Sequence, residues 1–231
     1  MGVLQAITKY TLLLLLAIPI GCGSVSTGSR GPSQEATPGI QRMFKARKSV
    51  CILRVKGSQG SAVSLLKDGN HTYLGTAAHM VDESAVGDVV QIEWYDRGRH
   101  FGEAKVYAVS ATDDIAILVT GSPVPVASFD DRKLSPPMEV SSIGCPMGMF
   151  PPNVSVGYLV KGHEGMYSSS ATSWFGNSGG ALVDFSTGYV IGILVHLHGD
   201  GISALSVYTC SVPMYKLVEF GKEVFKIRRG R

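Results

Sequence analysis

The sequence predicts an all-β domain, either a barrel or a sandwich, that is closed by one C-terminal helix. Of its 231 residues, 45% are hydrophobic and 17% are charged, a globular composition with enough apolar material for a core. The apolar stretches are short and rich in Val, Ile, Thr and Tyr, and turn signals separate them at close intervals. No segment before Pro213 holds a long apolar pattern with the 3.6-residue period of a helix.

These apolar stretches are interpreted as strands in order along the chain. An Asp-Gly pair at residues 68–69 predicts a tight hairpin between the second and third stretches, and Ser-Thr-Gly at residues 186–188 predicts another turn within the ninth. The expected strands cover residues 49–56, 61–66, 71–78, 88–95, 103–110, 114–120, 138–144, 154–161, 180–197 and 202–212.

The helix is expected to begin at Pro213, because proline is well tolerated in the first turn of a helix. Its apolar side chains fall roughly on one stripe, which is typical of a helix that covers a core. They are Met214, Leu217, Val218, Val224 and Phe225. A domain of about 190 residues can be built as one unit or as a fused pair of barrels.

The first 22 residues predict a secretory signal. Lys9 precedes an apolar run over residues 12–20 that is shorter than the roughly 18 residues a membrane-spanning helix needs. The stretch "IGCGS" resembles the lipobox of bacterial lipoproteins, in which the cysteine, here Cys22, is acylated, although Pro19 stands where that motif usually has leucine. Lipidation, plain secretion and an uncleaved anchor therefore stay open, and a secreted or periplasmic location is expected.

Residues 23–42 are mostly small or polar and predict a flexible linker. The folded domain is therefore expected at residues 43–231. The net charge of the whole chain is +3, which is too small to indicate binding to nucleic acid or to an anionic membrane surface. Contact with a membrane is expected only through the N-terminal signal or a lipid.

Three cysteines remain beside Cys22: Cys51, Cys145 and Cys210. No CxxC spacing indicates zinc, and buried thiols that pack as small hydrophobic groups are the main expectation, with one disulfide as the alternative. His196 and His198 alternate onto one strand face, but no third ligand at a useful spacing accompanies them. We therefore expect no metal and no cofactor.

The stretch "SWFGNSGGAL", residues 173–182, surrounds Ser178 with glycines. Such a cluster indicates a sharp turn or the close approach of another molecule. A serine hydroxyl becomes a nucleophile only with a base in hydrogen-bond reach and a third group that orients the base. His79, directly after an expected strand, and Asp114, at the head of another, are the candidates. Asp113 is rejected because strand alternation points it to the other side.

The motifs around these three residues carry a resemblance. "TAAH" at His79, "DIAIL" at Asp114 and "GNSGGAL" at Ser178 resemble, in that order, the signature blocks of trypsin-like serine peptidases. "SSIGCPMG" at residues 141–148 resembles the G-x-P-x-G strand end of HtrA-type (DegP-like) peptidases, and the similarity runs from about residue 49 to residue 214.

The resemblance implies two six-stranded antiparallel β-barrels with a C-terminal helix. It further implies a serine endopeptidase that acts on proteins or peptides through an acyl-enzyme intermediate, with an oxyanion hole formed by the backbone N–H groups of Gly176 and Ser178. No segment of PDZ size follows Pro213, so trimer assembly is not carried over and the oligomeric state stays open.

Three alternatives accompany this interpretation. "TSWFGNSGG" is also similar to small viral serine peptidases, so a bacterial, phage or viral source stays open. G-x-S-x-G fits the nucleophile elbow of α/β-hydrolases, but that fold needs an acid and a histidine after the serine and helices before it. A catalytically inert trypsin-fold module that binds a peptide or protein is the alternative function.

The family pattern also places the pocket for the side chain before the scissile bond. It implies that Thr172, six positions before Ser178, and the strand residues Val195, His196 and Leu197 line it. No carboxylate lies between Tyr167 and Ser178 to bind Arg or Lys, and Leu197 is expected to shorten the pocket. Cleavage after Ala or Val is therefore expected, while His196 offers a competing route to Gln or Glu.

Overall fold

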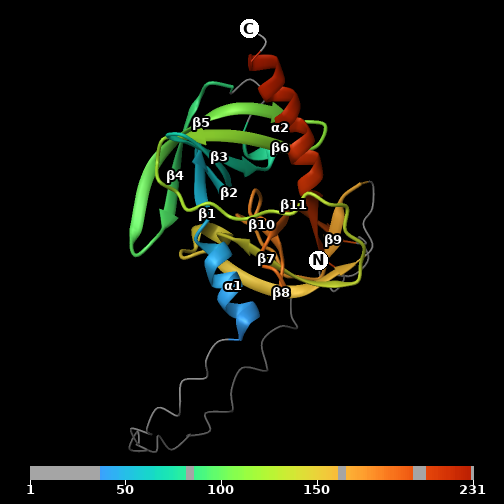
Figure 1. Cartoon of the computed structure of the whole chain (residues 1–231). Helices are drawn as coiled ribbons and strands as arrows, with labels where there is room; N and C mark the ends of the chain where they lie inside the picture. The colour runs from blue at the N-terminus through green and yellow to red at the C-terminus, as the bar shows by residue number, and fades with distance from the viewer. Residues whose placement is uncertain (1–36, 82–85, 161–164, 200–206, 230–231) are drawn as a thin grey trace, which may run out of the picture. The chain divides into compact units, whose positions relative to one another are not determined.

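Within the part of the chain that the structure describes, twelve strands form two closed antiparallel barrels (Figure 1). The structure is a computed structural model, and it describes residues 37–81, 86–160, 165–199 and 207–229, without side chains at 197–199, 207 and 227–229. All of these residues belong to one compact unit. The fold class implied by the family resemblance is confirmed, and of barrel and sandwich the chain forms barrels.

The first barrel has the strand order β1-β2-β3-β6-β5-β4 and closes where β4 pairs with β1. Its strands are β1 (Val50–Val55), β2 (Ser58–Asp68), β3 (His71–Thr76), β4 (Val89–Tyr95), β5 (Arg99–Ser110) and β6 (Ile115–Thr120). The second barrel has the order β10-β11-β12-β9-β8-β7. Its strands are β7 (Met138–Gly144), β8 (Asn153–Val160), β9 (Tyr167–Ser169), β10 (Ala181–Asp184), β11 (Val190–Gly199) and β12 (Val207–Pro213).

Strand β1 shows how the core is divided. Its first four residues are all buried, yet they belong to two clusters, because successive side chains of a strand point to opposite faces. Cys51 and Leu53 point into the first barrel, whereas Val50 and Ile52 join the cluster that packs between the barrels. A third cluster, which includes Leu159 and Leu182, fills the second barrel. The junction between the barrels is therefore an apolar core of buried side chains, as are their interiors.

The C-terminal helix α2 (Met214–Arg229) lies where the sequence predicts it. Met214 and Leu217 are buried at its start, and Phe225 packs edge-on against Tyr73 of β3. Within the described residues no helix is long and apolar enough to cross a membrane.

Helix α1 (Pro38–Arg47) is an element that the sequence analysis did not predict, and it begins inside the segment expected to be a linker. Only Met43 and Ala46 are buried on it, so its apolar pattern is too short to stand out in the sequence. Strand β9 was also not predicted, because three residues carry no readable alternation. Two predicted turns are confirmed: Gly69, between β2 and β3, and Gly188, between β10 and β11, have positive φ angles of 57° and 76°.

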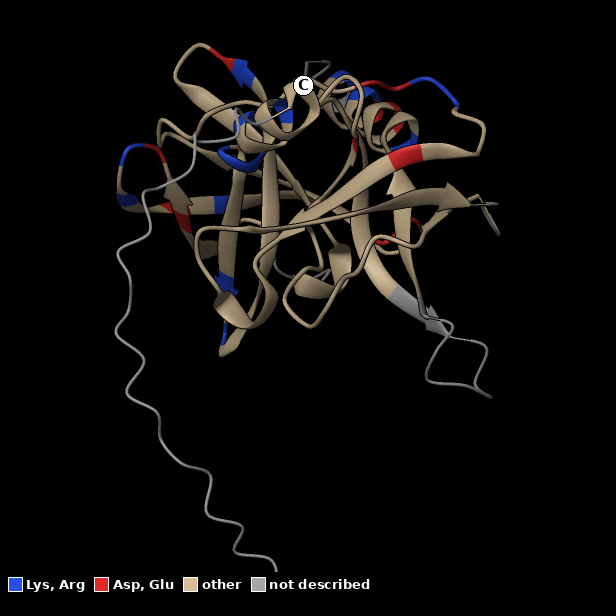
Figure 2. Cartoon of the chain, turned by 90° about the horizontal axis from the view of Figure 1, so that it is seen from below, with Lys and Arg blue, Asp and Glu red and all other residues tan. Residues whose placement is uncertain are grey.

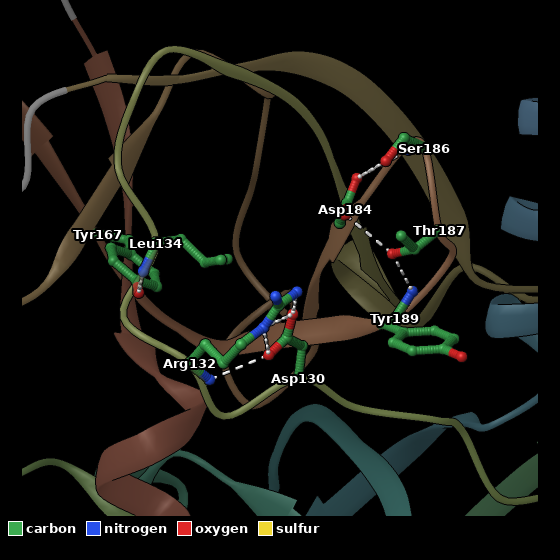
Figure 3. Close-up of polar contacts among 8 residues, drawn as sticks. All are labelled: Asp130, Arg132, Leu134, Tyr167, Asp184, Ser186, Thr187 and Tyr189. Carbon is green, nitrogen blue, oxygen red and sulfur yellow. Dashed lines mark hydrogen bonds and ion pairs between the residues drawn. The ribbon is translucent and has the colours of Figure 1, made fainter.

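The segment that crosses from β6 to β7 is held against the second barrel (Figure 3). Asp130 N–H donates to the Val190 carbonyl at 2.9 Å, and the N–H of Leu134 donates to the hydroxyl of Tyr167 at 2.9 Å. The guanidinium of Arg132 pairs with the carboxylate of Asp130 and lowers the pKa of that carboxyl. In the neighbouring β10–β11 turn, Asp184 accepts from the side chains of two turn residues, which fixes the hairpin.

The cysteines Cys51, Cys145 and Cys210 are free thiols and all three are buried, as the sequence analysis predicted. Burial raises the pKa of each thiol, that of Cys145 to about 12. Cys22 lies outside the described residues. On the surface, basic and acidic residues stand side by side in several loops (Figure 2), in line with the small net charge.

Candidate active site

The structure brings His79 and Asp114 into direct contact. His79 lies in the short helix η1 (Ala78–Met80), which follows β3 after the buried Ala77. Its ring Nδ1 is 2.9 Å from Oδ2 and 3.1 Å from Oδ1 of Asp114, and its backbone N–H donates to Oδ1 at 2.9 Å. The carboxylate therefore holds both the ring and the backbone of His79, and it sets Nδ1 as the protonated ring nitrogen.

Asp114 reaches His79 from a turn and not, as the sequence analysis expected, from a strand. Strand β6 begins one residue later, and Asp114 itself has a left-handed backbone with φ of 52°. Asp is one of the few side chains that adopt this conformation at low cost. The strand argument was wrong. Of the two acids, Asp114 contacts His79, whereas Asp113 turns away and pairs with Lys216 of α2 at 2.9 Å.

The electrostatics keep Asp114 ionised. Partial burial of the carboxyl opposes its ionisation, but the hydrogen bonds from the ring and the backbone of His79 outweigh burial. The pKa of Asp114 therefore lies below its ordinary value. An ionised carboxylate at this position can hold the ring orientation and stabilise an imidazolium.

Ser178 and His79 both line one cavity of about 580 Å³. In this structure the Ser178 hydroxyl donates to the backbone carbonyl of Val195 at 3.1 Å, so the hydroxyl is not turned toward the imidazole. A rotation about the Cα–Cβ bond of serine moves the hydroxyl without moving the backbone. The loop that carries Ser178 lies between β9 and β10 of the second barrel, whereas His79 and Asp114 belong to the first. The cavity therefore lies at the junction of the barrels.

The backbone next to Ser178 is aligned by bonds to its carbonyls. The Phe175 carbonyl accepts from Met147 N–H at 2.7 Å, and the Asn177 carbonyl accepts from Gly180 N–H at 2.8 Å. Because the N–H of a trans peptide points opposite to its carbonyl, the N–H groups of Gly176 and Ser178 point away from these contacts. Neither N–H has an acceptor among the residues that the structure describes.

Gly176 occupies a position that only glycine fits. Its φ is 97°, and a Cβ there would lie 2.7 Å from the Cys145 carbonyl oxygen and 2.8 Å from Met147 N. Residues 144–148, which carry the G-x-P-x-G motif, form the wall that this Cβ would strike. The glycine at this position is thus explained by the backbone of its neighbours.

The lining of the cavity beside Ser178 agrees only in part with the residues expected from the sequence. Val195 and His196 line it, as expected, but Thr172 is not among its described lining residues, and Ser173 stands in that place. Thr172 is exposed, and its backbone is bonded to the hydroxyls of Ser142 and Ser155. The side chain of Leu197 lies outside the described residues.

Further lining residues were not predicted: Trp174, Phe175, Asn177, Leu194 and Thr209. Two of them, Trp174 and Phe175, are exposed aromatic side chains. The signal available in the sequence was this aromatic pair directly before the glycines of the Ser178 loop. Thr209 comes from β12, far away in sequence, and nothing local indicates it.

A second cavity, of about 400 Å³, lies between α2 and strands β2 and β3. Its described lining is almost entirely apolar, with Lys222 and Lys226 as its charged residues, and includes no Ser, Cys, His, Asp or Glu. Among the residues described, no group of three His, Cys, Asp or Glu side chains lies close enough to hold a metal ion, and the side chain of His198 lies outside them.

Comparison with known proteins agrees with this fold. A protein-family model described as "Trypsin-like peptidase domain" matches residues 51–193. No curated protein sequence matches significantly. Among solved structures, a serine endoprotease from Yersinia pestis superposes with a TM-score of 0.69 at 21% identity, covering 86% of this chain and 70% of that one. The HtrA-type protease AlgW, solved with a tripeptide, superposes with a TM-score of 0.67 at 22% identity, and the alignment covers 80% of this chain and 63% of AlgW.

Proposed function

This chain belongs to the trypsin-like peptidase family, and from that premise we propose that it is a serine endopeptidase with Ser178 as nucleophile, His79 as base and Asp114 as the orienting acid. One observation carries the proposal above all. His79, which Asp114 holds at 2.9 Å, and Ser178 line the same cavity although they come from two different barrels.

In the proposed reaction the Ser178 hydroxyl first rotates from the Val195 carbonyl toward His79. The Nε2 atom of His79 removes its proton as the oxygen attacks a peptide carbonyl carbon, and later donates that proton to the leaving amine. Water then repeats the two steps on the acyl-enzyme, with His79 again as base. Asp114 stays ionised throughout and stabilises the imidazolium.

The N–H groups of Gly176 and Ser178 are proposed as the oxyanion hole. Both N–H groups point away from the bonded carbonyls and have no acceptor among the described residues, which supports their availability to an oxyanion. A donor of this kind lowers the barrier by about 3 kcal/mol because negative charge develops on the oxygen only in the transition state.

The substrate is proposed to be a peptide or protein whose residue before the scissile bond is glutamine. The sequence left open an aliphatic residue, Ala or Val, and a polar one, Gln or Glu, at this position. A polar residue is supported by the Ser173 hydroxyl, which is buried in the cavity lining without a hydrogen-bond partner among the described residues. Leaving such a group unpaired costs about 1–3 kcal/mol, which a substrate amide would remove. His196 and Thr209 offer further polar atoms, and the described lining holds no Lys or Arg to favour glutamate.

An inert module that binds a peptide is the competing function, favoured by the bond from the Ser178 hydroxyl to Val195. A fluorophosphonate probe on the purified protein separates the two, because it reacts only with an activated serine. We expect labelling of Ser178 that disappears in His79→Ala and in Ser178→Ala and persists in Ser186→Ala, which removes an exposed serine. No labelling of the wild-type protein, under conditions that label trypsin, would favour the binding module.

The location of the protein is proposed from residues 1–36, all of which lie outside the described residues. The apolar run followed by small residues supports export from the cytoplasm, with the mature chain secreted, periplasmic or anchored through an acylated Cys22. Metabolic labelling with palmitate tests the anchor. Acylation that is lost in Cys22→Ser supports it, and a mature form that begins after Cys22 contradicts it.

A further inference from the structure

The buried Ser61 of β2 connects the first barrel to the loop that carries Ser178. Its hydroxyl donates to the carbonyl of Gly176 at 2.7 Å and accepts from the N–H of Cys145 at 2.9 Å. Its backbone N–H donates to the carbonyl of Ser178 at 2.8 Å. Ser61 is fully buried, so water does not compete for these bonds.

The hydroxyl of Ser61 holds the one peptide unit that lies between the two proposed oxyanion donors. The unit before it, which carries Gly176 N–H, is fixed by Met147, and the unit after it, which carries Ser178 N–H, is fixed by Gly180. The middle unit joins residues 176 and 177. Its N–H donates to the Trp174 carbonyl at 2.9 Å, and its carbonyl is bonded, among the described residues, by the Ser61 hydroxyl alone.

Rotation of this middle unit would change ψ of Gly176 and φ of Asn177, and so the angle between the two donors. Gly176 is the residue most able to rotate, because it has no Cβ. Fixing the carbonyl of Gly176 from the opposite barrel therefore restrains the most flexible bond of the loop.

The backbone carbonyl of Ser61 is held in turn by the strand that leads to His79. The Thr76 hydroxyl donates to the Ser61 carbonyl at 2.7 Å, and Thr76 ends β3, three residues before His79. Gly179 packs so closely on the same carbonyl that a Cβ there would lie 2.0 Å from it. The bonds of Ser61 therefore link the strand that leads to His79 with the loop that carries Ser178.

We propose that Ser61 is a positioning residue for this site: its hydroxyl holds the Gly176–Asn177 peptide so that the N–H groups of Gly176 and Ser178 converge on one oxygen atom. This inference rests on the proposed peptidase function. Ser61 does not contact the substrate, so its loss lowers transition-state stabilisation and leaves ground-state binding of the peptide unchanged.

The test compares Ser61→Ala with Ser64→Ala. Ser64 is fully buried on the same strand, and its hydroxyl has no hydrogen-bond partner, so this control removes an equivalent atom without removing a bond. Ser61→Ala is expected to lower kcat about 10- to 100-fold with KM nearly unchanged, because a misaligned donor loses part of the roughly 100- to 1000-fold effect of a missing one. Ser61→Cys, with a weaker donor of similar shape, is expected to fall between Ser61→Ala and the wild type.

A peptide boronate, which forms an anionic tetrahedral adduct with an active serine, gives a second measurement. Its inhibition constant should rise in Ser61→Ala by the same factor as kcat falls, and binding of the product peptide should not change. Equal kcat in Ser61→Ala and Ser64→Ala, or a rise in KM that accounts for the whole loss, overturns the proposal.

Amide hydrogen exchange tests the positioning role of Ser61 without a measurement of catalysis. The Asn177 N–H belongs to the peptide unit that Ser61 holds, so it should exchange faster in Ser61→Ala than in Ser64→Ala at equal global stability. Unchanged exchange of Asn177 overturns the positioning role even in an active enzyme. A wild-type protein without peptidase activity overturns the proposed function instead, and the exchange result still decides whether Ser61 holds the loop.

Discussion

Asp114 Oδ2 lies 2.9 Å from Nδ1 of His79, while the carboxylate of the preceding residue, Asp113, points away and pairs with Lys216 at the same distance. Two adjacent acids thus serve two different cationic or basic groups, one in the proposed site and one on helix α2. The left-handed turn at Asp114 separates them. This pair of neighbours offers a matched test of the site.

Asp114→Asn is expected to lower kcat/KM about 10⁴-fold while the protein remains folded, because an amide NH₂ can turn toward Nδ1 and favour the wrong ring tautomer. Asp113→Asn removes a partly exposed ion pair and is expected to keep kcat/KM near the wild-type value, with a loss of stability of no more than about 1 kcal/mol. Steady-state kinetics on a peptide substrate measure both. Equal losses in the two variants would contradict the assignment of Asp114.

Acid should remove the part of the stability that Asp114 supplies. Its pKa is lowered in the folded protein, so the unfolded chain binds more protons at this carboxyl. The contribution is fully present above the ordinary carboxyl pKa of about 4 and is lost as the pH falls through the lower pKa of the folded state. Urea unfolding of the wild type and of Asp114→Asn over this pH range measures it. The difference in the free energy of unfolding between the wild type and Asp114→Asn should become smaller as the pH falls. A difference that does not change with pH contradicts an ionised Asp114.

Gly176→Ala should abolish the proposed oxyanion site, because the added Cβ meets the Cys145 carbonyl at 2.7 Å and the left-handed backbone adds strain. We expect kcat to fall at least about 100-fold, the loss typical of one missing donor. Gly57→Ala is the control, since Gly57 also has positive φ, 88°, but a Cβ there meets nothing within 4 Å. It should cost only about 1 kcal/mol of stability. Full activity of Gly176→Ala would exclude its N–H from the mechanism.

A peptide library decides which residue precedes the cleaved bond. Wild-type protein is expected to prefer glutamine, and His196→Val should shift the preference toward aliphatic residues, because a substrate amide then loses a polar partner in the pocket. Ser178→Ala controls for contaminating proteases. Dominance of Ala or Val in the wild type would support the earlier expectation based on Leu197, and Leu197→Gly should then widen acceptance toward Phe. Dominance of Arg or Lys contradicts both.

Much of the fold follows from local patterns. Short alternating stretches located most of the strands, and Gly69 and Gly188 marked their turns, because strand periodicity and turn chemistry depend on neighbouring residues. The elements that were missed, α1 and β9, are those with the weakest local signal. Helix α1 buries two side chains, and β9 has three residues.

The sequence by itself determined which residue types are present for chemistry: His79, Asp114 and Ser178, each in a motif of a few adjacent residues. Tertiary structure alone decided how they are arranged. In the tertiary structure Ser173, and not Thr172, lines the cavity, and Asp114 has a left-handed backbone. The hydroxyl of Ser61 lies against a carbonyl 115 positions later in the chain. Such contacts depend on barrel closure and on the packing of one barrel against the other, and the local periodicity of a strand carries no information about either.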